Sequence, residues 1–303
     1  LFTGKLPDFM DTVTLLYPMR MAVAEQLWAG TLPLWLPNVF CGAPLAADPQ
    51  VTAWYPPQFL FYLWPTPAGN GLVVLFHYVF GGMGIYFWTR QYTRGRASAL
   101  FAGVLFQFGS MLLSRIALPV NLYPVVWIPW IFFAAERSLD RLSWRPRTGA
   151  MAVGALAAVQ LLAGGPQISY YTLLLLPVFW LLRAWQTAGK GENPARRVAQ
   201  AAAQGLYAAV LAVLLAGIQL LPTLEFLRHA ERSTIDVERL QQQALHGEYL
   251  WRALVGFTGE TIEDTDTINA IGLGALLLIP FAFLRRRSRH PAHSHGRRFH
   301  PRS

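Results

Sequence analysis

The stretch 32–58, LPLWLPNVFCGAPLAADPQVTAWYPPQ, is apolar and aromatic, yet it contains six prolines. A proline inside a helix removes a backbone donor and moves the preceding residue out of the helical region, so this stretch cannot form a continuous membrane helix. Irregular backbone cannot face lipid either, because its N–H and C=O groups would lack partners there. We therefore expect the stretch to lie at a membrane–water boundary or to pack on helices, with Trp35 and Tyr55 helping to hold the loop.

The composition of the chain indicates a membrane protein. Of its 303 residues, 54% are hydrophobic and 14% are charged, and the mean hydropathy is +0.33. These values are too apolar for an ordinary soluble domain and predict an all-α, polytopic membrane helix bundle with the lipid bilayer as partner. The net charge of +9 does not indicate nucleic acid as a partner, because the basic residues fall between hydrophobic runs. The single Cys41 excludes an intrachain disulfide.

Seven hydrophobic runs predict about seven spans, each near the lower limit of the roughly 17–25 residues that a membrane helix needs. Before them, residues 12–29 have apolar positions at helical spacing with Arg20 and Glu25 on the other side, which predicts a helix in the interface that Gly30 ends. The runs are 72–88, 97–113, 119–135, 149–164, 168–184, 201–221 and 269–284.

The distribution of charge predicts the sidedness of the loops. Eighteen of the 25 Lys and Arg residues lie in the segments 89–96, 136–148 and 183–200 and in the tail, which marks these as cytoplasmic. The opposite side holds 13 of the 16 acids. The predicted organisation is an extracytoplasmic loop at 1–71, a six-helix membrane region at 72–221, a second extracytoplasmic loop at 222–268, a seventh helix at 269–284 and a basic, disordered cytoplasmic tail at 285–303.

Short motifs follow one another along most of the chain. They are YPMR at 17–20, GTLPLWLP at 30–37, GAPLAADPQ at 42–50, YPP at 55–57, GGPQ at 164–167, QLLPTLEF at 219–226 and IGLGALLL at 271–278. In this order and spacing they resemble the YfhO family of bacterial multi-pass membrane proteins. Leu36 stands where that family usually has Asn, and Asp48 stands where Asn is also common, which argues against Asp48 as a catalyst.

The resemblance implies a place in the bacterial cytoplasmic membrane and a relationship to the GT-C glycosyltransferases, which use lipid-linked sugars. It also implies a preceding helix and further helices after residue 284, so that this chain would be truncated at both ends. The implied reaction is the transfer of a sugar from a polyprenyl-phosphate donor to an extracytoplasmic glycan, polymer or lipid acceptor of the cell envelope. Asp11 matches the acid of the family's first external loop, which serves as a base or as a metal ligand.

The chemistry of a carboxylate is compatible with that role, because it can deprotonate a hydroxyl or hold a divalent cation beside a phosphate. A divalent cation is therefore a candidate cofactor, although the sequence does not identify a set of metal ligands. Asp11 can equally be a solvated or helix-capping acid. Asp48, within the proline-rich stretch, is expected to hold a turn through side chain-to-backbone hydrogen bonds.

Arg20 and Arg232 lie in the family-like segments on the predicted external side, and we expect them to bind the donor phosphate. Guanidinium groups match phosphate oxygens bidentately. The alternative is that these arginines bind lipid headgroups or pair with neighbouring glutamates.

The interiors of the predicted helices contain His77 and four glutamines but no charged residue. Ion-coupled transporters usually bury ionisable groups near the middle of the membrane, so this pattern favours the enzyme. The alternative function is a non-catalytic transport or assembly component of envelope polymer export, in which His77 and the glutamines form a polar path. His77 can also be a structural residue that bonds a neighbouring helix.

Overall fold

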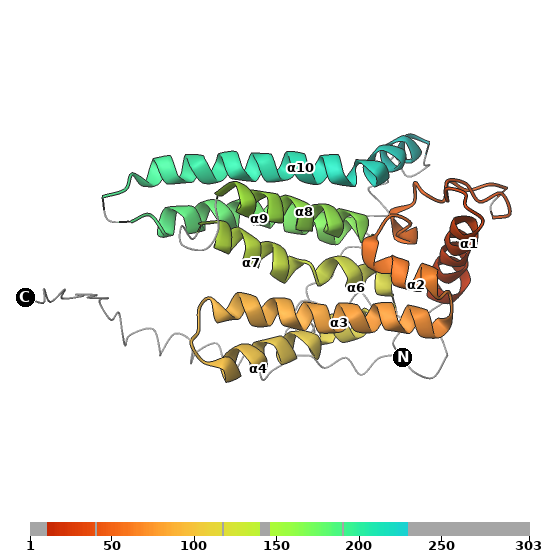
Figure 1. Cartoon of the computed structure of the whole chain (residues 1–303), viewed down its shortest axis with the longest axis horizontal. Coiled ribbons are helices and arrows are strands. Elements are labelled where there is room, and N and C mark those ends of the chain that lie inside the picture. The colour runs from red at the N-terminus through yellow and green to blue at the C-terminus, as the bar shows by residue number, and fades with distance from the viewer. Residues whose placement is uncertain (1–10, 40, 117, 140–145, 190, 230–303) are drawn as a thin grey trace, which may run out of the picture. The chain divides into compact units, whose positions relative to one another are not determined.

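The computed structural model describes residues 11–39, 41–116, 118–139, 146–189 and 191–229 (Figure 1). Within these ranges all regular elements are helical, apart from one isolated bridge between Leu36 and Ala43. The all-α class is therefore confirmed for this part of the chain. The predicted tail, the predicted helix at 269–284 and Arg232 lie outside the described residues.

The elements follow the apolar runs of the sequence, and several begin where proline is tolerated. Pro67, Pro166 and Pro194 each occupy the first helical position, where a backbone N–H would have no helical partner. The α-helices are α1 Tyr17–Trp28, α2 Phe59–Leu63, α3 Pro67–Arg90, α4 Arg96–Gln107, α5 Ser110–Ser114, α6 Pro119–Val125, α7 Ile128–Leu139, α8 Pro146–Leu162, α9 Pro166–Gln186 and α10 Pro194–Arg228. The shorter elements are a π-helical turn at Thr12–Leu16 and 3-10 turns at Pro49–Val51 and Pro56–Gln58.

Three of the described helices, α3, α9 and α10, are long and apolar enough to cross a membrane. This agrees with a membrane protein, but it is fewer than the seven spans that the sequence predicts. Two of the predicted runs are each divided into two shorter helices. The run 97–113 is interrupted before Gly109, and the run 119–135 is interrupted between α6 and α7.

The break between α6 and α7 has a local cause. Pro129 is the second residue of α7, a position that tolerates a missing N–H, whereas a continuous helix through this point would place Pro129 in its interior. The sequence predicts one span over 119–135, but the structure begins a new helix at Ile128. At the other end, α10 continues past Leu221 to Arg228, so the predicted second loop begins in a helix.

Glycine allows the helices to approach closely. A Cβ atom added to Gly154 of α8 would lie 2.7 Å from the carbonyl oxygen of Ala208 in α10, and one added to Gly103 of α4 would lie 2.9 Å from that of Gly82 in α3. Small residues at such crossings are typical of membrane bundles, where packing rather than water exclusion holds helices together. The close approach of α8 to α10 and of α4 to α3 therefore depends on glycine at positions 154 and 103.

The proline-rich loop 32–58 folds onto the ends of the helices, as the sequence predicts for a stretch that cannot span. Leu45, Val51 and Tyr55 are fully buried. The side chains of Gln219 and Thr223 in α10 donate to the carbonyls of Ala46 and Ala47, at 3.0 and 2.7 Å. These contacts join a loop near the start of the chain to the far end of α10.

The GGPQ motif supplies the turn between α8 and α9 that lies against this loop. Gly164 and Gly165 have φ of +78° and +54°, which favours glycine at both positions. A Cβ atom on Gly164 would lie 2.7 Å from Val120 Cγ2 and 3.1 Å from the carbonyl oxygen of Pro49. The tight turn therefore brings the loop, α6 and α9 together.

Candidate functional site

Asp11, the predicted catalytic acid, lies at the start of the first described helical segment and is exposed. Its side chain makes no capping hydrogen bond. No ion pair between Asp11 and Arg20 occurs among the residues that the structure describes.

Arg20, the predicted phosphate ligand, is buried in α1 with 1% of its surface exposed. One Nη atom donates to the carbonyl oxygen of Gln50 at 3.3 Å, and the guanidinium lies 5.4 Å from the centroid of the Tyr123 ring. Its Nε has no hydrogen-bond partner among the described residues. In this arrangement Arg20 contacts the proline-rich loop through Gln50 and α6 through Tyr123, and phosphate binding by Arg20 stays a prediction.

A chain of hydrogen bonds lies next to Arg20 and joins the loop to α3 and to the turn between α6 and α7. The indole Nε1 of Trp127 donates to the hydroxyl of Tyr55 at 2.7 Å. That hydroxyl lies 2.6 Å from Nε2 of His77, whose Nδ1 lies 2.6 Å from the carbonyl oxygen of Val73. Tyr123 stacks on His77, with ring centroids 4.2 Å apart.

The direction of this chain follows from its two ends. A carbonyl oxygen only accepts, so Nδ1 of His77 carries the proton and Nε2 accepts from Tyr55. Burial raises the pKa of Tyr55 well above its ordinary value of 10.0, so its hydroxyl is neutral and can donate. Trp127 thus donates to Tyr55, Tyr55 donates to His77, and His77 donates to the carbonyl of Val73. Each of the three donors in this chain has one acceptor. This arrangement favours a structural role for His77.

Asp48 caps the 3-10 turn at Pro49–Val51, accepting a hydrogen bond from the backbone N–H of Gln50 at 2.8 Å. Burial raises the pKa of this carboxyl above 3.8, while the Gln50 bond and the charge of Arg20 oppose that shift. Asp48 therefore makes the local contact expected of an acid that holds a turn.

The other two loop residues singled out from the sequence differ in exposure. Tyr55 is fully buried, whereas Trp35 is 54% exposed. The indole of Trp35 lies so close to Gly42 that an added Cβ would be 2.5 Å from its Cζ2 atom. Its backbone carbonyl accepts from Gln26 Nε2 of α1 at 2.9 Å. Both residues contribute to the loop's own packing.

The glutamines within the predicted membrane segments also bind structural carbonyls. Gln107 donates to the carbonyl of Tyr78 at 2.9 Å, and Gln160 donates to that of Pro124 at 2.9 Å. Gln219 donates to the loop, as given above. Two buried amide oxygens of these described side chains, Oε1 of Gln204 and Oε1 of Gln219, have no hydrogen-bond partner. These contacts are separate, and none of them links one glutamine to the next.

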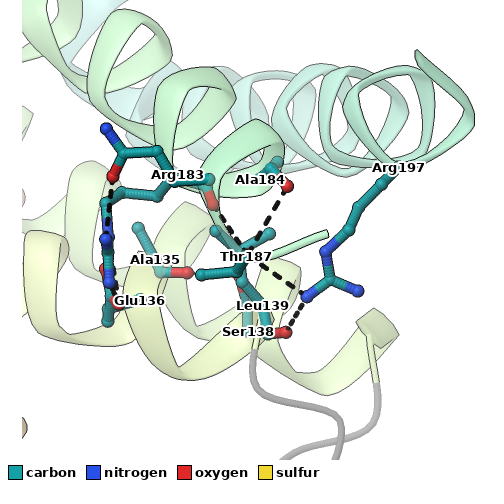
Figure 2. Close-up of polar contacts among 9 residues, drawn as sticks. Ala135, Glu136, Ser138, Leu139, Arg183, Ala184, Thr187 and Arg197 are labelled. Atoms are coloured by element: carbon teal, nitrogen blue, oxygen red, sulfur yellow. Dashed lines mark hydrogen bonds and ion pairs between the residues drawn. The ribbon is translucent and has the colours of Figure 1, made fainter. Parts of the chain in front are cut away.

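A second polar cluster lies at the basic ends of α7, α9 and α10 (Figure 2). Arg183 of α9 forms a bidentate ion pair with Glu136 of α7, with Nε 2.8 Å from Oε2. Arg197 of α10, only 8% exposed, donates to the carbonyl of Leu139 at 2.6 Å and lies 3.4 Å from the hydroxyl of Thr187. Because the last carbonyls of a helix lack helical partners, this contact satisfies the end of α7.

Within the described ranges no three His, Cys, Asp or Glu side chains are grouped so that they could hold a metal ion. The candidate divalent cation therefore has no preformed ligand set in this part of the protein. Comparisons of the chain with protein-family models, with curated proteins and with solved structures find no match. The family resemblance of the motifs stays a prediction.

Sequence reasoning missed the role of two side chains. The sequence gives no indication of the role of Trp127, and it marks Gln219 only as a polar residue inside a helix. A signal for both was present, because a donor side chain in an apolar run must find an acceptor. The acceptor of Gln219 is 173 residues away in the chain, which no local pattern identifies.

Proposed function

We propose that this protein is a polytopic protein of the bacterial cytoplasmic membrane that transfers a sugar from a polyprenyl-phosphate donor to an envelope acceptor. In this proposal the chain crosses the membrane about seven times, and loops 1–71 and 222–268 are extracytoplasmic. Asp11 is the general base or the ligand of a divalent cation. Arg20 and Arg232 are the candidate ligands of the donor phosphate, and Arg20 also contacts the proline-rich loop through the carbonyl of Gln50.

The observation that carries the proposal is a contrast between buried polar side chains, which are hydrogen-bonded to backbone carbonyls, and the exposed Asp11, which makes no capping hydrogen bond. His77 and the glutamines Gln107, Gln160 and Gln219 spend their donors on carbonyls of the protein itself, so they supply no continuous polar path for a transported ion. Asp11 is exposed and makes no capping bond. This contrast supports chemistry at the exposed rim and weighs against transport through the helices.

The arrangement of the loop gives further support. A catalytic rim needs a fixed frame, and loop 32–58 is tied to α1 by Arg20, to α10 by Gln219 and to α3 by Tyr55. Fixed elements hold reacting groups more closely than a free loop would. Asp11 begins the segment that continues into α1, the helix that carries Arg20.

The test compares two carboxamide substitutions in a full-length version of the protein. Asp11→Asn retains size and hydrogen bonding but removes the charge, so we expect sugar transfer to fall about 10²-fold or more. Asp48→Asn should retain most activity, because an amide oxygen can still accept from the Gln50 N–H. Transfer of radiolabelled sugar from a polyprenyl-phosphate donor in isolated membranes measures both, with protein levels as control.

The pattern of loss decides between the hypotheses. If Asp48→Asn abolishes transfer while Asp11→Asn does not, the two carboxylates have the opposite roles. If neither change affects transfer, the enzyme hypothesis loses its support. The transport or assembly function would then take its place.

A further inference from the structure

The short helix α2 exposes apolar side chains because it has no polar face. All five of its residues, FLFYL at 59–63, are apolar or aromatic. Phe61 and Tyr62 are buried, and the other three are exposed. Leu63 is the extreme case, with 76% of its surface exposed, and Trp64 directly after the helix is 54% exposed. A helix that is apolar on all sides is normally covered by protein or by lipid.

The end of α1 continues this exposed surface. Trp28, the last residue of α1, donates from Nε1 to the backbone carbonyl of Tyr62 at 2.9 Å, so its indole lies beside α2. The side chain of Trp28 is nevertheless strongly exposed. We call Trp28, Leu63 and Trp64 the α1–α2 corner. Both ends of the loop 32–58 meet this corner, because the loop starts four residues after Trp28 and ends directly before α2.

The sequence around the corner is almost free of charge. Between Glu25 and Arg90 the only charged residue is Asp48, whereas 14% of the whole chain is charged. Asp48 is engaged in the cap of its own turn in the loop. A protein surface in water normally carries many charged side chains of both signs. The exposed side chains of the corner therefore indicate surroundings that are less polar than water.

The position of α3 gives the depth of the corner in the membrane. α3 is a candidate membrane helix with Arg90 in its last turn, and Arg94 and Arg96 follow. The hydrocarbon core takes about 20 helical residues, so counted back from Arg90 it ends near Gly71. Trp64 precedes Gly71 by seven residues, which places the corner near the headgroups. Figure 1 shows α1 running across the ends of the long helices, as a helix in the membrane plane would.

We propose that the α1–α2 corner is an interfacial anchor, seated among the headgroups and upper acyl chains of the leaflet at the N-terminal end of α3. Trp28 and Trp64 place their rings at this level, where tryptophan is enriched in membrane proteins, and Leu63 reaches the acyl chains. The anchor holds both ends of the loop 32–58 at the membrane surface. This role is independent of the proposed glycosyl transfer.

The chemistry of the corner also predicts which lipids it accepts. Attraction to anionic lipids requires Lys or Arg near the membrane surface. The corner has neither, and Arg20, the nearest basic residue before it in the sequence, is buried. The contact is therefore hydrophobic. It does not distinguish zwitterionic phosphatidylcholine from anionic phosphatidylglycerol.

A fluorescent label on a single cysteine reports the surroundings of the corner. Cys41 is the only cysteine of the chain, so Cys41→Ser provides the background for single-cysteine variants. Leu63→Cys tests the corner, and the high exposure of Leu63 keeps the loss of packing small. Val210→Cys, on an exposed part of α10 inside its apolar run, is the control for the membrane interior. Arg196→Cys, exposed near the start of α10, is the control for water.

Each labelled chain is reconstituted into phosphatidylcholine vesicles, with iodide on both sides of the membrane as the aqueous quencher. Iodide should quench the label at Leu63 several-fold less than the label at Arg196. A lipid nitroxide near the headgroup should quench the label at Leu63 more than a nitroxide near the end of the acyl chain, and the order should be reversed at Val210. Replacing part of the phosphatidylcholine by phosphatidylglycerol should change none of these results.

Four results would overturn the proposal. Equal iodide quenching at Leu63 and Arg196 would place the corner in water. A label at Leu63 that neither iodide nor either nitroxide reaches would show that protein, such as a second copy of the chain, covers the corner. Stronger quenching by the deeper nitroxide would place the corner inside the hydrocarbon. Protection from iodide that appears only with phosphatidylglycerol would make the contact electrostatic. If Leu63→Cys aggregates in gel filtration, Trp64→Cys carries the label and must give the pattern expected at Leu63.

Discussion

The hydrogen-bond chain through Tyr55 predicts a large loss of stability from the removal of one oxygen atom. Tyr55→Phe keeps the ring and its stacking with Tyr123 but deletes the hydroxyl that joins Trp127 to His77. Two buried groups then lose their partners at once. These are the indole N–H of Trp127, a donor, and Nε2 of His77, an acceptor.

The expected size follows from the cost of an unsatisfied buried polar group, about 1–3 kcal/mol for each. With two such groups, Tyr55→Phe should lower the free energy of unfolding by about 2–6 kcal/mol. Tyr62→Phe is the matched control. Its hydroxyl donates to the carbonyl of Thr52 at 3.1 Å, but that carbonyl also accepts from the backbone N–H of Tyr55 and keeps a partner. Tyr62→Phe should therefore cost only about 0.5–1.5 kcal/mol.

The two variants are compared by equilibrium unfolding of the purified protein in mild detergent, with a denaturing detergent as the perturbant. Both residues are fully or almost fully buried tyrosines of the same loop region, so the loss of transfer free energy is similar in both. Equal destabilisation by the two changes would refute the closed hydrogen-bond chain. It would also reopen the assignment of Nδ1 of His77 as the protonated nitrogen.

Two further predictions concern the loop and its neighbouring turn. Asp48→Asn should stabilise the protein at pH 7. Burial raises the pKa of the Asp48 carboxyl in the folded state, so the unchanged protein loses stability as the pH rises from the unfolded-state pKa towards the folded-state pKa. The neutral amide avoids this loss. The gain should vanish below about pH 3.8, where both states are protonated, and unfolding at both pH values measures it; a less stable variant at pH 7 contradicts the sign. Gly164→Ala should cost about 1–3 kcal/mol because of its positive φ and the close Val120 methyl, whereas Gly217→Ala in open helix should gain up to about 1 kcal/mol. Thermal unfolding that gives both changes the same sign would contradict this.

The positions of the long helices could be predicted because a span is a local property of the sequence. The run 168–184 corresponds to α9 at Pro166–Gln186, and the run 201–221 lies inside α10 at Pro194–Arg228. The observed helices are longer because their polar ends, such as Arg196 and Arg197, continue the backbone pattern without adding hydropathy. Hydropathy marks the buried or lipid-facing part of a helix rather than its ends.

The interruptions of two runs could not be predicted with the same success. Pro124 lies inside α6, whereas Pro129 marks a new helix, although both prolines belong to one apolar run. The local rule states only that a proline disturbs a helix. Whether the helix bends or breaks also depends on distant partners, and here Gln160 of α8 donates to the carbonyl of Pro124, one of the last carbonyls of α6, which lack helical partners. That contact is 36 residues distant in the chain.

The candidate site shows the same limit. An arginine beside a predicted membrane surface has two outcomes, because its long side chain can reach water or fold inward. Arg20 folds inward, where it meets Gln50 from the loop and Tyr123 from α6. Neither partner is close in sequence, so the motif around Arg20 could indicate importance without indicating whether it binds a ligand or holds the fold.

The prolines themselves explain why these inward donors are needed. Six prolines in the loop 32–58 provide six carbonyls but no N–H groups, so the loop has an excess of acceptors. Buried carbonyls must find donors, and the helices provide them from their side chains. The donors are Arg20 to Gln50, Tyr62 to Thr52, Gln219 to Ala46 and Thr223 to Ala47. Residues that look functional by pattern are thus required by the irregular backbone, and Asp11, an acceptor that cannot donate when ionised, has no part in that requirement. Whether the exposed carboxylate of Asp11 has a chemical role is the question that the Asp11→Asn variant tests.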